Sequence, residues 1–271
     1  MTLNLIFFDV GHGNSVLIKT DTINMLFDLG MGENKNPLDY INGKLDFLII
    51  SHPHLDHISG LAEMENRTPT TILRNKSIPK RLIKNSIDLT DNPKAIDAFN
   101  KYLKLDKEYT IKTPIESSPT NSNYNGGVEF AYFSPNENAE DLNYYSLAVF
   151  LKYEGVKILL MGDNTIQNIN ELLENNKFKE LTKHIDILLA PHHGRETCYS
   201  EDLMNHTKPK ITIISDKSDN NDKSAIDNYS SKSKGKLILK NGKLKERKCL
   251  TTRKDGDIFV KVENGNLKIY C

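Results

Sequence analysis

The sequence predicts an α/β fold in which two mixed sheets pack together and helices lie on the outside. Three features support this prediction. Many short apolar runs are separated by turn residues, as expected of strands. The clearest helical periodicity fills one stretch, residues 166–184. Strands and helices do not alternate regularly along the chain, and this disfavours a doubly wound parallel sheet.

Strand-like runs occur on both sides of a central polar segment. They cover residues 5–10, 15–20, 24–30, 46–51, 128–133, 146–153, 156–163, 185–190 and 210–215. Residues 256–271 hold two further runs around the letters NGN and predict a final hairpin. Weaker helical patterns lie at residues 57–67 and 91–105.

The chain has 271 residues, which suits one large α/β domain, and we expect a single domain over residues 1–271. Two polar segments stand apart from it. Residues 66–125 are rich in Asn, Ser, Thr and Lys and predict an insertion or a cap with one or two helices. Residues 216–234 predict an exposed loop with a short helix.

Composition limits the setting more than the function. The 36 Lys and Arg residues balance the 36 Asp and Glu residues, so net charge neither favours nor excludes a nucleic-acid partner. The three cysteines form no CxxC pair, which favours a reducing compartment. The N-terminus lacks the basic segment of a signal peptide, and no apolar run approaches the roughly 20 residues of a membrane span. We therefore expect a cytoplasmic protein.

The stretch SHPHLDH, residues 51–57, follows an apolar strand and gathers imidazoles with a carboxylate. In an extended segment His52 and His54 point the same way, so they can share one metal ion. Asp56 and His57 come one turn later and can serve a second ion. This mixture of ligands suits Zn²⁺, Mn²⁺ or Fe²⁺. A solvated loop rich in histidine is the alternative explanation.

Two later stretches favour the metal site over that alternative. VKILLMGD places Asp163 after a second apolar strand, and IDILLAPHHG places His192 and His193 after a third. Three strands that each end in a possible metal ligand indicate one sheet edge carrying one site. Asp163 also precedes the helical stretch at 166–184, so capping that helix is its alternative role.

These motifs, in this order, resemble the metallo-β-lactamase fold superfamily. FFDVGHGNSVLIKT, NMLFDLG, SHPHLDHISGL, NYYSLAVFLKYEGVKILLMGD and LLAPHHG are similar to the hydrolase domain of the bacterial DNA-uptake (competence) channel protein and its free-standing relatives. The resemblance covers most of the chain outside residues 66–125 and 216–234. It implies an αββα sandwich with a metal centre at one sheet edge.

The resemblance also implies two divalent ions, Zn²⁺ or Mn²⁺, as cofactors. The implied ligands are His52, His54, Asp56, His57, Asp163 and His193. His52 and His54 would bind the first ion. Asp56 and His57 would bind the second with His193, and Asp163 would bridge the two. His192 would then face the substrate.

The chain departs from the superfamily in two places. Many members supply a third histidine to the first ion, but this chain has no histidine between residues 58 and 183. The matching stretch LNYYSLAVF offers Asn143 and Ser146, which are poor substitutes, so the first ion should bind more weakly. The loop DVGHGNS carries His12 and Asn14 where the family usually has Gln and Asp. We treat His12, Asn14, Asn143 and Ser146 as candidate substrate contacts.

The predicted chemistry is hydrolysis by a metal-bridging hydroxide, with Asp56, Asp163 and His192 as the catalytic residues. The chain has no G-x-S-x-G nucleophile motif and no phosphate-binding P-loop motif. We interpret Cys198, near the site in sequence, as a bystander thiol. The predicted enzyme is therefore a metal-dependent phosphodiesterase or nuclease.

Two basic stretches, residues 74–84 and 231–248, could meet the phosphates of DNA, RNA or a nucleotide. For the second stretch a solvated, amphipathic hairpin face is the favoured explanation, because aromatic stacking partners are absent there. Two other functions stay open. The same scaffold could hydrolyse an ester, lactone or thioester. It could also be a non-catalytic metal-binding subunit that assists a partner protein in a DNA-uptake or defence complex.

Overall fold

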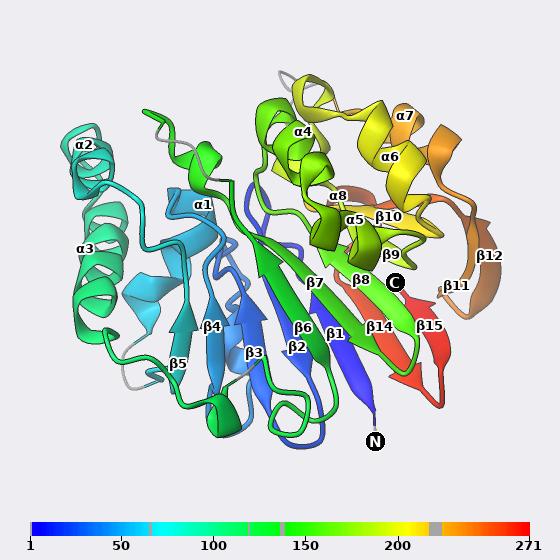
Figure 1. Cartoon of the computed structure of the whole chain (residues 1–271), viewed down its shortest axis with the longest axis horizontal. Helices are drawn as coiled ribbons and strands as arrows, with labels where there is room; N and C mark the ends of the chain where they lie inside the picture. Colours follow the sequence, from blue (N-terminus) through cyan, green and yellow to red (C-terminus); the bar gives the residue numbers. More distant parts are fainter. Residues whose placement is uncertain (1, 65–66, 119, 136–138, 217–223) are drawn as a thin grey trace.

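The computed structural model describes residues 2–64, 67–118, 120–135, 139–216 and 224–271. Two sheets lie face to face, and helices cover their outer faces (Figure 1). Both sheets mix parallel and antiparallel pairs. The αββα sandwich expected from the sequence is confirmed, and each predicted strand run contains a strand.

In the described part of the chain the larger sheet has nine strands, in the order β12-β11-β15-β14-β1-β2-β3-β4-β5. Their bounds are β1 (Leu3–Phe7), β2 (Val16–Lys19), β3 (Asn24–Phe27), β4 (Phe47–Ile49), β5 (Thr71–Leu73), β11 (Lys236–Lys240), β12 (Lys243–Arg247), β14 (Ile258–Glu263) and β15 (Asn266–Tyr270). The predicted final hairpin is the antiparallel pair β14 and β15. β3 and β4 run parallel, so the loops that follow them leave from the same edge.

The smaller sheet has the order β13-β10-β9-β8-β7-β6 among the described residues. Its strands are β6 (Glu129–Phe133), β7 (Ala148–Tyr153), β8 (Val156–Leu160), β9 (Ile187–Leu189), β10 (Ile211–Ile214) and β13 (Cys249–Thr251). β8, β9 and β10 are parallel neighbours. Their carboxyl ends therefore meet at one edge, which is where the sequence placed its second and third ligand-bearing loops.

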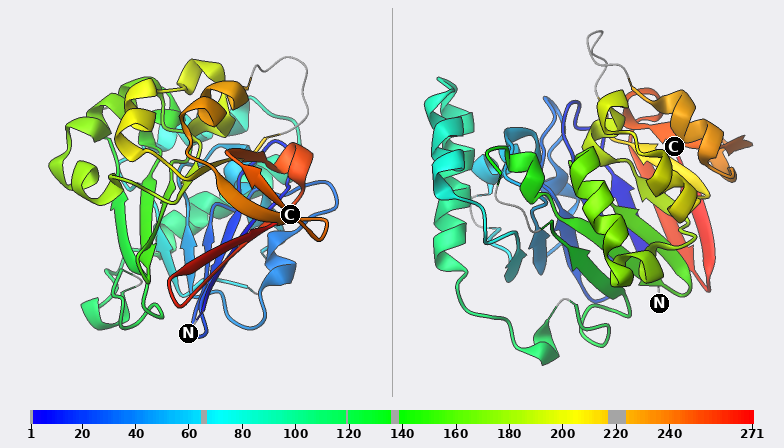
Figure 2. Two further views of the ribbon diagram at one scale, coloured as in Figure 1. Left: turned by 90° about the vertical axis from the view of Figure 1, so that its right-hand side faces the viewer. Right: turned by 45° about the horizontal axis from the view of Figure 1, so that its top comes forward.

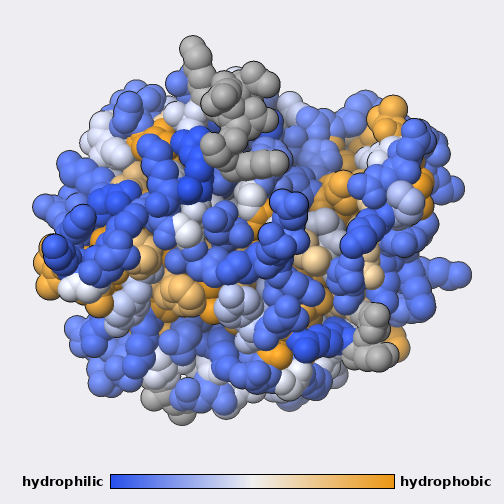
Figure 3. Space-filling model, turned by 180° about the vertical axis from the view of Figure 1, so that it is seen from behind, coloured by the Kyte–Doolittle hydropathy of each residue, from blue (hydrophilic) through white to orange (hydrophobic). Residues whose placement is uncertain are grey.

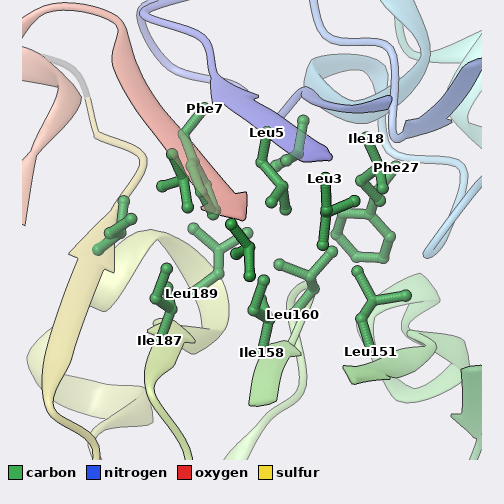
Figure 4. Packing of buried hydrophobic residues seen from close by; sticks show 14 of the residues in the cluster. Leu3, Leu5, Phe7, Ile18, Phe27, Leu151, Ile158, Leu160, Ile187 and Leu189 are labelled. Atoms are coloured by element: carbon green, nitrogen blue, oxygen red, sulfur yellow. The ribbon is translucent and has the colours of Figure 1, made fainter. Parts of the chain in front are cut away.

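The main core lies between the two sheets, and the alternation of side chains along the strands produces it. β1 buries Leu3, Leu5 and Phe7 on its inner face. They meet side chains of the smaller sheet, including Ile158 and Leu160 of β8 (Figure 4). Burial on this scale is the main source of stability in a domain of this size. It also gives the strand ends a rigid base.

Helices form the two outer layers. Their bounds are α1 (Leu55–Ile58), α2 (Lys80–Asp88), α3 (Pro93–Glu108), α4 (Ile166–Glu174), α5 (Asn176–Thr182), α6 (Glu201–Thr207), α7 (Ile226–Lys232) and α8 (Thr252–Asp255). Short 3₁₀ helices are η1 (Pro37–Tyr40), η2 (Ser59–Glu63), η3 (Ile115–Ser117), η4 (Leu142–Tyr145), η5 (Pro191–Gly194) and η6 (Glu196–Cys198). Phe99 and Tyr102 of α3 pack on the outer face of the larger sheet. Ile169 of α4 and Phe178 of α5 pack on the smaller one.

The helix predicted over residues 166–184 is wrong in its continuity. The structure has two helices, α4 and α5, with Asn175 between them in an extended conformation. Its side-chain oxygen accepts a hydrogen bond from the backbone N–H of Phe178 at 3.0 Å, so Asn175 caps the start of α5. This local bond competes with continuation of the helix.

The two polar segments contribute ordered structure. Within residues 66–125, β5 extends the larger sheet beside β4, and α2 and α3 follow it. Figure 2 shows these helices at one side of the molecule, apart from the helices over the smaller sheet. Of residues 216–234, α7 forms the end, whereas 217–223 lie outside the described residues. β5, β11, β12 and β13 lie outside the predicted strand runs.

The basic stretch 231–248 forms the antiparallel hairpin of β11 and β12 at one edge of the larger sheet. Lys240 and Arg247 both form ion pairs with Asp255. Part of the positive charge of this hairpin is therefore neutralised within the fold.

The back of the molecule is mostly hydrophilic, with separated apolar patches (Figure 3). Across the described ranges, we find no helix with the length and apolar character needed to cross a bilayer.

Candidate metal centre

Loops that leave β4, β8 and β9 bring the possible metal ligands together. Two groups of such side chains result, with ligand atoms within 4.8 Å of one another in each group. The first group is His52, His54 and Asp163, and the second is Asp56, His57, Asp163 and His193. Asp163 belongs to both. The structure thus brings together the six side chains that the sequence nominated as ligands, in two groups that share Asp163.

The second group is the more complete. Nε2 of His57 lies 3.2 Å from Oδ1 of Asp163 and 3.5 Å from Oδ2 of Asp56. Nε2 of His193 lies 3.1 Å from that same Asp56 oxygen and 3.5 Å from Oδ2 of Asp163. Two imidazoles and two carboxylates that converge in this way make a suitable set for one divalent ion.

The first group has fewer protein ligands. Nε2 of His52 lies 2.9 Å from Nδ1 of His54 and 3.9 Å from Oδ2 of Asp163. Three ligands plus solvent form an acceptable shell for a catalytic ion. An ion held by three protein groups should leave more readily than one held by four.

The buried Nε2 of His57 tests whether an ion fits. Among the described residues this nitrogen makes no well-directed hydrogen bond, although His57 is fully buried and a carboxylate oxygen of Asp163 lies 3.2 Å away. A buried polar atom without a partner is costly, and a coordinated cation would remove that cost. His52 and His57 are both inaccessible to solvent, so neither is a solvated loop histidine. The residues fit a divalent metal.

The remaining ring nitrogens of the ligand histidines are held by the protein. Nδ1 of His57 donates to Oδ2 of Asp28 at 2.8 Å. Nδ1 of His193 donates to the backbone carbonyl of Ser215 at 2.9 Å, and Nδ1 of His52 lies 3.1 Å from the hydroxyl of Ser51. Such contacts fix the ring orientation and leave Nε2 facing the ion.

Asp28 is the functional residue that sequence reasoning missed. It follows β3 and has a left-handed backbone, with φ of 57°. Its carboxylate accepts from Ser51 N at 2.7 Å, Ser51 Oγ at 2.9 Å, Asn14 Nδ2 at 3.0 Å and Nδ1 of His57. The sequence did contain a sign of this role. Asp28 follows an apolar strand in NMLFDLG, just as Asp163 follows one in VKILLMGD.

The PHHG turn after β9 has an unusual backbone. His192, His193 and Gly194 all have positive φ, at 47°, 54° and 69°. Two consecutive left-handed histidines are uncommon, and such strain concentrates at functional sites. The turn sends His193 into the second group and leaves His192 beside it, with its Nε2 3.7 Å from Oδ2 of Asp163.

The contacts of His192 define where its ring carries a proton. Nη1 of Arg195 donates to Nε2 of His192 at 3.2 Å, so that nitrogen presents its lone pair. The proton of the neutral ring then lies on Nδ1, which faces Sγ of Cys198 at 3.2 Å. Burial is the main cause that lowers the pKa of His192. Burial likewise raises the pKa of the Cys198 thiol, which disfavours a thiolate nucleophile.

Of the four candidate substrate contacts, His12 is the exposed one, and its Nε2 lies 3.9 Å from Oδ2 of Asp56. Asn14, Asn143 and Ser146 are buried. Asn14 donates to Asp28, and the backbone carbonyl of Asn143 accepts from Asn168. Asn14 thus contacts the carboxylate that holds His57, whereas the side-chain oxygen of Asn143 is buried without a hydrogen-bond partner among the described residues.

Ser146 lies beneath the turn that carries Asp163. Its hydroxyl accepts a hydrogen bond from the backbone N–H of Asp163 at 2.8 Å. Gly162 has φ of 53°, and a Cβ atom there would lie 2.5 Å from the Ser146 oxygen. The Gly-Asp sequence therefore allows the chain to turn tightly against Ser146 and present the carboxylate.

Charges within the centre shift several pKa values. Burial lowers the pKa of His52 well below its usual range. Burial also opposes a charge on His57, but the carboxylates of Asp163, Asp56 and Asp28 outweigh it and raise its pKa strongly. For His193 the same opposition between burial and the two aspartates raises the pKa to about 10. The metal-free centre thus holds protons where an ion would carry positive charge.

Binding of Zn²⁺ or Mn²⁺ to the metal-free protein at pH 7 is expected to release protons from His57 and His193. Their raised pKa values keep both rings protonated, and a ligand nitrogen must lose its proton to bind metal. Apparent affinity should therefore rise with pH, and release from His193 should fade as pH passes about 10. Calorimetric titration in two buffers of different ionisation enthalpy measures the protons released. Equal heats in both buffers would contradict this expectation.

Comparison with known proteins adds a family and a set of folds. A model of the metallo-beta-lactamase superfamily matches residues 8–203, a range that includes every member of both ligand groups. No curated protein matches the chain.

Several solved structures are similar at low identity. They include the metallo hydrolase Igni18 from Ignicoccus hospitalis, at 18% identity over 79% of this chain and 82% of that chain, with a TM-score of 0.46. The metallo-beta-lactamase fold protein YhfI from Bacillus subtilis has 11% identity over 78% and 85%, with a TM-score of 0.44. A diphosphatase of the PhnP family has 14% identity over 79% and 86%, with a TM-score of 0.44.

Proposed function

The chain belongs to the metallo-beta-lactamase superfamily, and from this premise we propose that it is a metal-dependent hydrolase that cleaves phosphodiesters. One observation carries the proposal: two groups of ligands share the carboxylate of Asp163. Two ions held by these groups would have Asp163 as a common ligand. When bound, such a pair supplies Lewis acidity and an activated water for in-line displacement at phosphorus. We expect Zn²⁺ or Mn²⁺.

The chain's own residues would divide the work. His52 and His54 would hold one ion, and His57 and His193 would hold the other with Asp56. Asp163 would be a ligand of both. The proposed reaction consumes one water, breaks one P–O ester bond, and yields a phosphomonoester and an alcohol.

His192 is the proposed proton carrier. Its Nε2 lies 3.7 Å from the shared carboxylate and accepts a hydrogen bond from Arg195. An anionic substrate that takes over the Arg195 donor would free Nε2 to accept a proton from the attacking water, and the leaving oxygen would take its proton from solvent. The lowered pKa of His192 keeps Nε2 unprotonated at neutral pH, as this role requires.

We propose that the chain is related to the hydrolase domain of the DNA-uptake channel protein, on the strength of its motifs and their order. DNA, RNA or a nucleotide is then the proposed substrate class, and a partner protein in a DNA-uptake or defence system is compatible with it. The basic hairpin of β11 and β12 offers some support, since Lys243 and Lys245 lie exposed on it.

Metal-dependent turnover tests the proposal. Protein stripped with a chelator and reloaded with Zn²⁺ or Mn²⁺ should hydrolyse bis-p-nitrophenyl phosphate faster than a lactone or a thioester. His54→Ala should lower the phosphodiesterase rate by roughly 10²-fold, because it removes one of three ligands of the first ion. His184→Asn, an exposed histidine outside both groups, is the matched control.

The other outcomes select the alternatives. Faster turnover of the lactone or thioester would assign acyl hydrolysis to this centre. A protein that takes up metal but hydrolyses none of the three substrates would be a non-catalytic metal-binding subunit.

A further inference from the structure

Arg195 occupies a position that neither the sequence motifs nor the two ligand groups account for. Its backbone is fixed on both sides: its N–H donates to the carbonyl of His192 at 3.1 Å, and its own carbonyl accepts from Cys198 at 3.0 Å. The side chain leaves this short segment half-buried and reaches back toward the metal centre. The position of the guanidinium is therefore set by the PHHG turn.

The guanidinium lies between two imidazoles on opposite sides of the centre. Nη1 donates to Nε2 of His192 at 3.2 Å, and Nη2 approaches Nε2 of His12 at 3.5 Å. Those two ring nitrogens lie 3.7 Å from Asp163 and 3.9 Å from Asp56 respectively. One cationic side chain thus lies along the exposed rim of the centre. It contacts His192, which lies beside Asp163, and His12, which lies beside Asp56.

Charge and shape indicate what this arrangement would bind. A guanidinium presents paired N–H donors that match two oxygens of one phosphate. Two of the contacts of Arg195 at this rim go to imidazole nitrogens at 3.2 and 3.5 Å, and an anionic oxygen can replace an imidazole as the acceptor. The three carboxylates near the centre carry less negative charge than two divalent ions and a guanidinium would carry positive charge; they are Asp28, Asp56 and Asp163. A centre loaded with both ions would therefore have a net positive charge, which favours an anion.

We propose that Arg195 is the phosphate clamp of this enzyme: it binds the non-bridging oxygens of the scissile phosphate and selects phosphodiesters over neutral acyl substrates. The inference rests on the proposed function and deepens it. A carboxylic ester, lactone or thioester has no anionic oxygen at its reacting centre. It would gain little from the guanidinium, whereas negative charge that develops on phosphorus oxygens would gain much.

The test compares Arg195→Ala and Arg195→Lys with Arg81→Ala, a surface arginine of α2 that pairs with Glu140 away from the centre. In Arg195→Ala the kcat/KM for bis-p-nitrophenyl phosphate should fall about 100-fold, while a neutral p-nitrophenyl ester should change less than about threefold. Arg195→Lys keeps the charge but loses the paired donors, and its rate should lie between the two. Added guanidinium chloride should restore part of the rate of Arg195→Ala.

Binding supplies a readout that does not depend on turnover. Calorimetric titration of the metal-loaded protein with inorganic phosphate should show an affinity at least about tenfold weaker in Arg195→Ala, with an unchanged metal content by elemental analysis. Equal losses for the phosphodiester and the neutral ester would overturn the proposal, and so would unchanged phosphate affinity. If the loaded wild type hydrolyses no phosphodiester but phosphate binding still depends on Arg195, the proposed function fails and the anion clamp stands.

Discussion

Asp163→Ala is expected to abolish turnover, to empty the first metal position and to weaken the second. The carboxylate is the one ligand common to the two groups, so its loss leaves the first with two imidazoles and the second with three ligands. We expect the metal content to fall to about one ion per chain or less and kcat/KM to fall by about 10³-fold or more. Elemental analysis of the purified variant and a phosphodiesterase assay measure the two effects.

Asp97→Ala provides the comparison, because Asp97 is an exposed aspartate on α3 outside both ligand groups. It should keep both ions and full activity. A variant of Asp163 that retains two ions would show that the groups do not share this ligand. One that retains two ions and loses activity would assign Asp163 a purely chemical role.

Much of this centre was predictable from the chain. His52, His54 and Asp56 lie close together in sequence, so a short loop after one strand brings them near one another without long-range knowledge. Asp163 and His193 were predictable for a different reason. Each follows an apolar run, and the carboxyl ends of parallel strands meet at one edge.

Other features of the site and the fold depend on contacts between residues far apart in the chain, and the spacing of residues in the sequence does not reveal such contacts. Ser146 could have faced the cleft or the core, and its bond to the Asp163 backbone decides in favour of the core. Arg195 lies 183 residues from His12, yet the fold brings their side chains within 3.5 Å. The break between α4 and α5 at Asn175 was partly predictable, since asparagine favours helix caps. Helical periodicity on both sides of Asn175 nevertheless suggested one continuous helix.

Asp28→Ala is expected to weaken both the fold and the metal site. It removes a fully buried carboxylate and leaves the donors of Ser51, Asn14 and His57 without their acceptor. Breaking such a buried charged network costs about 3–5 kcal/mol in the free energy of unfolding. Loss of the anchor on Nδ1 of His57 should also lower metal affinity about 10- to 100-fold. Denaturant unfolding of the metal-free protein and competitive metal titration separate these effects.

Two comparisons make the result specific to the position. Asp46→Ala removes a carboxylate that accepts from the backbone N–H of Asn24 at 3.0 Å, at the end of β4 remote from the ligands. It should leave metal affinity unchanged. Asp28→Asn keeps one acceptor oxygen for the Ser51 backbone but turns an amide toward the other donors, so both losses should be partial. If Asp28→Ala lowered stability and left metal affinity intact, the orientation of His57 would be set by packing alone.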